Sequence, residues 1–234
     1  MIGGAAARIV LAGLAALLLA LAPGSAAAHH VGVYVPRDNE VSANFKQLKF
    51  AIQAGKLAVA SRLFDSGAVR AEMRAQSSRL PTGLEEATRA ALKAGDGRGA
   101  ERGLMVFFAA LARDLALKAD RRLGDPSEPA EGRAAAGRKF LEAIWRYYNL
   151  VDFAVTQYDS KAGVAIRLAL DEAEGYAKGV TGADGAGPGS VSKAAPGRPA
   201  AVPDPARMRE PLRLIARTLS GLIETLSTPT RRGS

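Results

Sequence analysis

The chain has 234 residues, a formal net charge of +9, two histidines and no cysteine. Without cysteine it cannot form disulfide bonds, thiolate metal centres, iron–sulfur clusters or covalently attached c-type haem, and it has no cysteine nucleophile. The positive charge suits an anionic partner, although the arginines are spread along the predicted helices, as is typical of solvated helix faces.

Residues 1–28 have the pattern of a secretory signal peptide. Arg8 is the positive n-region, residues 9–21 are the apolar h-region, and residues 25–28 are small, as cleavage requires. A transmembrane anchor is the alternative, but a spanning helix needs about 20 apolar residues. We therefore expect a periplasmic or secreted protein that begins near His29, with a charge of +8 because only Arg8 is lost. Nucleic acid is not an expected partner of an exported protein.

Residues 29–40 are expected to form an N-terminal arm. Within this arm, residues 31–35 could form a short extended strand. The first helix is predicted over residues 41–54, where apolar side chains recur at helical spacing, and either Asn39 or Ser42 is expected to cap it.

Three short segments and one long segment continue the helical pattern. We predict helices over residues 56–66, 68–79, 83–94 and 99–123. Thr82 and Glu85 have the spacing of a capping box, which predicts the start of the helix over residues 83–94.

Residues 137–176 carry the only tryptophan and most of the tyrosines. The segment predicts a helix that ends near Tyr158 and a partner helix over residues 161–178. One face of the first helix should carry a stripe of apolar residues: Phe140, Ile144, Tyr147, Val151 and Val155. Because aromatic side chains bury large areas, we expect the core to be built around this pair.

The C-terminal part is expected to have three pieces. Residues 179–203 are rich in glycine, alanine and proline, which predicts a flexible linker. Residues 204–228 should form a last helix, capped by Asp204 and with Pro205 in its first turn. Residues 229–234 form a basic tail.

Together these elements predict an all-α protein. Residues 41–178 should form one helical domain, in which helical hairpins pack as a bundle. A tight turn followed by a small residue recurs near Gly55, Gly95 and Lys161, and small residues allow antiparallel helices to approach closely. A tetratricopeptide-like solenoid is the alternative, but the spacing between these turns is not constant.

The first candidate site is the histidine pair His29 and His30. Cleavage after Ala28 would place an α-amine and two imidazoles within two residues, a nitrogen-rich set that suits Cu(II). Cleavage after Ala27 would instead put a histidine at position three, where Cu(II) or Ni(II) can be held in a square plane. A brace between two distant histidines is excluded, because no other histidine exists. The alternative is that the pair is incidental to the chain end.

Two further sets have simpler explanations. The carboxylates of residues 152–174 lack the Glu-x-x-His pairs of metal-binding bundles, so ion pairs with arginine are expected; Asp152 could be a buried acid or an arginine partner. An aromatic group could line a pocket for an apolar ligand or non-covalent haem, although core packing is the simpler interpretation; its members are Trp145, Tyr147, Tyr148, Phe153 and Tyr158. No catalytic triad or phosphate-binding glycine loop is present, so no enzyme is expected.

Residues 166–176, Ile-Arg-Leu-Ala-Leu-Asp-Glu-Ala-Glu-Gly-Tyr, resemble the helical periplasmic domains of bacterial iron-permease and imelysin-like proteins. The resemblance covers one helix pair and implies metal handling at the cell envelope. The metal-ligating acidic and histidine motifs of those families are not matched here, so it assigns no site residue.

Three functional hypotheses follow. In the first, an exported, non-enzymatic helical protein binds or delivers a metal ion, with copper expected, through His29 and His30. In the second, it is an exported interaction module that holds a protein partner in a groove between helices, or contacts the membrane surface through its basic charge. In the third, it binds an apolar ligand between helices.

Overall fold

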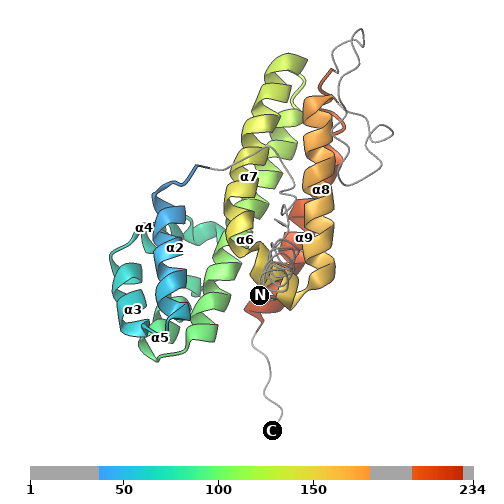
Figure 1. Cartoon of the computed structure of the whole chain (residues 1–234). Coiled ribbons are helices and arrows are strands. Elements are labelled where there is room, and N and C mark those ends of the chain that lie inside the picture. Colours follow the sequence, from blue (N-terminus) through green and yellow to red (C-terminus); the bar gives the residue numbers. More distant parts are fainter. Residues whose placement is uncertain (1–36, 180–201, 229–234) are drawn as a thin grey trace, which may run out of the picture. The chain divides into compact units, whose positions relative to one another are not determined.

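The computed structural model describes residues 37–179 and 202–228, all of which belong to one compact unit of the chain. These residues form eight α-helices that pack together, one short 3-10 helix and no strand (Figure 1). The all-α prediction is confirmed. The strand considered for residues 31–35, the signal peptide and the basic tail lie outside the described residues.

The first group contains four short helices. They are α2 (Glu40–Gln53), α3 (Leu57–Asp65), α4 (Ala68–Ala75) and α5 (Leu84–Lys93), with the 3-10 helix η1 (Ser77–Arg79) before α5. Helix α2 packs against α3 and α4, and α3 packs against α5. Asn39 caps α2 as predicted, because its side chain accepts from the Ser42 amide at 2.8 Å while Ser42 Oγ accepts from the Asn39 amide at 2.9 Å.

The second group contains four long helices: α6 (Gly97–Leu123), α7 (Ala130–Tyr158), α8 (Ser160–Lys178) and α9 (Arg209–Ser227). Each packs against the next along the chain, and α9 packs back against α6 (Figure 1). The first and last helices of the group are therefore neighbours. This closure distinguishes a bundle from a solenoid, in which each repeat contacts only its neighbours in sequence.

Helix α6 lies at the centre of the core. Residues 104–112 are all buried, since α2, α5, α7 and α9 all pack on this helix. Phe108 places its ring 4.5 Å from that of Phe45 and 4.9 Å from that of Phe107. The core is thus built around α6. The expectation from the sequence, a core built around the aromatic helix pair, is wrong.

The aromatic helix α7 contributes one buried edge to this core. Ile144, Val151 and Val155 are buried as predicted, but Tyr147 is half-buried and the fully buried tyrosine is Tyr148. Phe153 is 67% exposed.

Two predicted helix caps are wrong. Helix α5 begins at Leu84, so Gly83, with φ of 76°, occupies the N-cap position and Thr82 lies one residue too early to cap. Helix α9 begins at Arg209 and not at residue 204, where Asp204 instead caps a turn by accepting from the Arg207 amide at 3.0 Å. Pro211 explains the late start, because proline is tolerated in the first turn of a helix but breaks a hydrogen bond further inside.

Two hydrogen bonds join the segments on either side of residues 180–201. The Asp204 amide donates to the Tyr176 carbonyl at 2.9 Å, and the Arg207 guanidinium donates to the Tyr176 hydroxyl at 3.0 Å. Gly179, with φ of 78°, ends α8 in the left-handed conformation that glycine favours. Apart from Gly179 and residues 202–203, the predicted linker lies outside the described residues.

Candidate functional site

The histidine pair predicted as a metal site, His29 and His30, lies outside the described residues. Within residues 37–179 and 202–228, no three histidine or carboxylate side chains are grouped so that they could hold a metal ion. The copper hypothesis therefore depends entirely on the chain end and stays a prediction.

Asp152 is an arginine partner. Its carboxylate on α7 accepts from Nε of Arg167 on α8 at 2.9 Å and from Nη2 at 2.5 Å. Arg167 Nη2 also donates to Thr156 Oγ1 at 3.2 Å. Hydrogen bonding to Asp152 raises the pKa of Arg167, which stays charged. This cluster joins two helices and leaves no carboxylate free for chemistry.

Tyr148 lies one turn before Asp152 and is completely buried. Its hydroxyl lies near the Asp152 carboxylate but forms no hydrogen bond of ordinary geometry with a described residue. Burial raises the pKa of Tyr148 far above that of free tyrosine, and the charge of Asp152 adds to the effect. The phenol therefore keeps its proton at physiological pH and acts as a core side chain.

Two other acidic residues of the α7–α8 pair make structural contacts. Asp159 caps α8 by accepting from the Ala162 amide at 3.0 Å. Glu174 pairs with Lys178 at 2.5 Å. Burial raises the pKa of Asp171, and the neighbouring charge of Glu174 contributes.

A groove between α2, α6 and α7 is the strongest candidate for a binding site. Its volume is about 230 Å³ and it opens to solvent. Its apolar lining comes from all three helices: Phe45, Ile52, Leu104, Met105, Leu150, Val151, Phe153 and Ala154. Polar side chains complete the lining: Lys49, Gln53, Glu101 and Gln157. The groove lining is therefore mainly apolar, and its polar part carries one lysine and one glutamate.

Helical spacing explains how the sequence forms this groove. Phe45, Lys49 and Ile52 follow at four and then three residues on α2, so they share one face. Leu150, Ala154 and Gln157 repeat the same spacing on α7. Phe45 and Leu104 are nearly inaccessible, whereas Phe153 extends from the groove into solvent.

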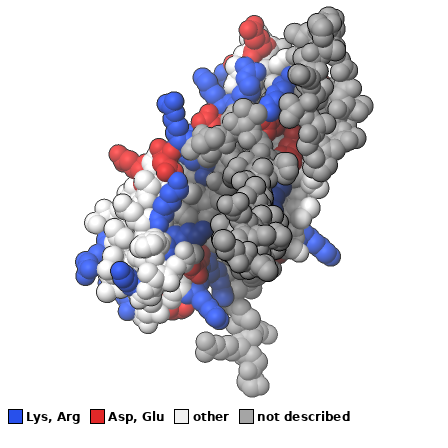
Figure 2. Space-filling view, in the orientation of Figure 1, with Lys and Arg blue, Asp and Glu red and all other residues white. Residues whose placement is uncertain are grey.

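The face of the molecule drawn in Figure 2 carries charges of both signs. Lysine and arginine side chains are scattered over the visible face, with aspartate and glutamate among them (Figure 2). Within the described part of the chain, no helix combines the length and apolar character that crossing a membrane requires.

Comparison with known proteins assigns no family. No protein-family model matches the chain, and neither a curated protein nor a solved structure is significantly similar to it. The resemblance of residues 166–176 to imelysin-like domains therefore stays a prediction. In the structure these residues belong to α8, where Ile166, Ala169 and Ala173 pack in the core as in any bundle helix.

Proposed function

We propose that the protein is an exported, non-enzymatic interaction module. Its groove between α2, α6 and α7 would hold the apolar face of a helix from an anionic protein of the cell envelope. The observation that carries this proposal is the mainly apolar lining that three helices contribute to the groove, which includes the exposed Phe153. Exposed apolar surface of this kind commonly marks an interaction site.

The size of the groove favours a macromolecular partner over a free apolar ligand. Small-molecule sites usually enclose about 300–1,000 Å³. The groove holds about 230 Å³ and is open, so it suits a few side chains presented by a larger molecule.

The length of the groove favours a helix as the bound element. Its α2 wall runs from Phe45 to Gln53 and its α7 wall from Leu150 to Gln157. At a rise of 1.5 Å per residue, these walls are about 11–12 Å long, which is two turns of a helix. A partner helix could insert apolar residues at positions i, i+3 and i+7, as in other helix-in-groove complexes. An extended peptide would lack a sheet edge to pair with in the described part of the chain.

Charge complementarity favours an anionic partner. Without residues 1–28 the chain would have a net charge of +8. Lys49 and Glu101 both line the groove, so the groove itself is formally neutral and the preference for an anionic partner comes from the net charge of the chain. An acidic helix would therefore be attracted over a distance and then held by apolar contacts.

Binding of designed peptides tests this proposal. The chain starting at His29 is titrated against a labelled amphipathic helical peptide with an acidic polar face, and against the same peptide with a basic polar face. We expect the acidic peptide to bind more tightly and Phe153→Ser to weaken its binding.

Leu168→Ser is the matched control, because Leu168 is 63% exposed on α8 and does not line the groove. Equal loss in both variants, or no binding of the acidic peptide, would contradict the proposal. Light scattering tests a second copy as the occupant: a dimer that Phe153→Ser dissociates would replace the heterologous partner.

A further inference from the structure

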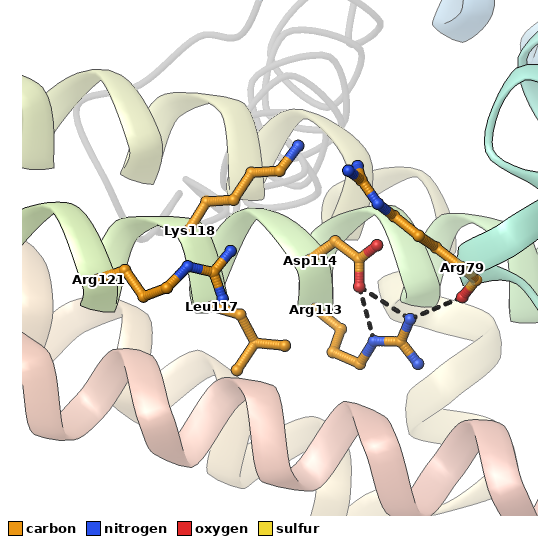
Figure 3. A pocket seen from close by; sticks show the side chains of 6 residues that line it. All are labelled: Arg79, Arg113, Asp114, Leu117, Lys118 and Arg121. Atoms are coloured by element: carbon orange, nitrogen blue, oxygen red, sulfur yellow. Dashed lines mark hydrogen bonds and ion pairs between the residues drawn. The ribbon is translucent and has the colours of Figure 1, made fainter.

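A second pocket lies where η1 meets the C-terminal half of α6. Its volume is about 300 Å³ and six residues line it: Arg79, Arg113, Asp114, Leu117, Lys118 and Arg121 (Figure 3). Four of these side chains are cationic and one is anionic, so the pocket has a formal charge of +3.

Arg113 fixes the geometry of this pocket. Its Nη2 donates to the Arg79 carbonyl at 3.0 Å, and its Nε donates to Asp114 Oδ1 at 2.9 Å (Figure 3). The side chains of Arg113 and Asp114 are only 18% and 19% exposed. Arg113 therefore ties η1 to α6, and the single carboxylate of the pocket is already engaged by Arg113.

The other three cations have no anionic partner in the described part of the chain. Lys118 and Arg121 form no ion pair there, and the Arg79 guanidinium has one long hydrogen bond, to the neutral Gln76 at 3.3 Å. Lys118 and Arg121 are three residues apart on α6, a spacing at which like charges repel. An anion bound between these side chains would relieve that repulsion.

We propose that this pocket binds phosphate groups. Guanidinium groups bind phosphate oxygens in pairs of parallel hydrogen bonds, and lysine adds a point charge. Three unpaired cations match the multiple charge of a phosphate better than the single charge of a carboxylate. The phosphate can belong to a free phosphate compound or to the headgroup of an anionic phospholipid, since the recognising chemistry is the same.

The phosphate pocket is separate from the groove of the proposed function. Leu104 of the groove and Leu117 of the pocket are 13 positions apart on α6. At about 3.6 residues per turn, this spacing places them on opposite sides of the helix. Each site can therefore be tested without altering the other.

Calorimetric titration tests the inference. The chain starting at His29 is titrated with inorganic phosphate and with pyrophosphate at constant ionic strength, and its sedimentation with vesicles of phosphatidylglycerol is compared with that on phosphatidylcholine. We expect binding of at least one phosphate ligand, weakened at least about tenfold in the double variant Lys118→Gln, Arg121→Gln, because two charged contacts are lost.

The matched control is Arg98→Gln, Lys139→Gln, which removes two exposed charges that no described carboxylate pairs. Binding of phosphate and pyrophosphate would identify a free compound as the ligand, and binding to phosphatidylglycerol vesicles alone would identify a lipid headgroup. Absence of all binding, or an equal loss in both double variants, would overturn the inference. Far-UV circular dichroism confirms that each variant is folded.

Discussion

The carboxylate of Asp152 on α7 and the guanidinium of Arg167 on α8 form a two-point ion pair, with the shortest contact at 2.5 Å. The two residues come from the helices that a single residue, Asp159, connects. The pair therefore fixes the rotation of one helix against the other near their shared turn.

We expect Asp152→Ala to lower the free energy of unfolding by about 1–2 kcal/mol. The loss should stay below that of a fully buried pair, because the Arg167 side chain is 39% exposed. Asn149→Ala is the matched control on the same helix, because the Asn149 side chain is exposed. Urea denaturation measures both; an unchanged midpoint for Asp152→Ala would show that the pair does not stabilise the fold.

Ile144→Ala should lower the free energy of unfolding by about 2–5 kcal/mol, the usual range for a buried isoleucine. Ile144 is completely inaccessible on the core edge of α7. Leu168→Ala on α8 should have little effect, because that side chain is 63% exposed. Equal urea midpoints for these two variants would contradict the placement of Ile144 in the core.

Asp120 should make stability depend on acid pH. Burial acts to raise its pKa, but hydrogen bonds from Arg209 at 2.8 Å and Arg213 at 3.1 Å hold the pKa below the ordinary value of 3.8. Because the folded pKa is the lower one, the stabilisation is complete above 3.8 and is lost as the pH falls toward the folded pKa. Asp120→Asn should therefore lower the free energy of unfolding strongly at neutral pH and less at pH values below 3.8. Urea unfolding measures both values. An equal loss at the two pH values would show that the pKa of Asp120 is not lowered in the folded protein.

Deletion of residues 185–194 should change stability little. The Asp204 amide donates to the Tyr176 carbonyl, so the chain segments on either side of residues 180–201 are already in contact, and a shorter linker can still join them. Loop length enters the free energy only logarithmically, by about 0.6 kcal/mol per doubling. Thermal unfolding of the deletion variant measures the effect, and loss of folding would show that the segment is structural.

The histidine pair is tested by copper titration. Protein exported by the cell should lack residues 1–28, which intact mass measures, and a chain starting at His29 should bind Cu(II) in preference to Ni(II) and Zn(II). Binding should weaken below about pH 6.5, where imidazoles become protonated. An additional N-terminal methionine, or the double variant His29→Ala, His30→Ala, should bind Cu(II) more weakly than the chain that starts at His29. Equal copper binding by all of these proteins would make the pair incidental.

Local sequence signals predicted local structure well. Asn39 is one of the two caps expected for α2, because asparagine is a preferred N-cap residue, and the fold class follows from helical spacing. The Asp204–Pro205 pattern predicts a start of α9 that is too early. Pro211 has no amide hydrogen to donate inside a helix, so the helix can begin only shortly before it, at Arg209.

The two sites could not be predicted, because each depends on tertiary contacts. The groove forms only where Phe45 of α2 meets Leu104 of α6 and Val151 of α7. The phosphate pocket requires Arg79 to lie beside Arg113, 34 residues later in the chain. Helical spacing shows which residues share a face of one helix, but it does not show which helices pack against each other.

The burial of α6 has a consequence for how its two sites communicate. Residues 104–112 are all buried and four helices pack on α6, so this helix has little freedom to shift or rotate between alternative positions. Energetic coupling between ligands requires an element with two arrangements that both ligands bias. A rigid α6 would instead act as a spacer. Occupancy of one site would then leave the affinity of the other site unchanged. The protein could bind a partner helix and a phosphate-bearing ligand at the same time, each with its own affinity.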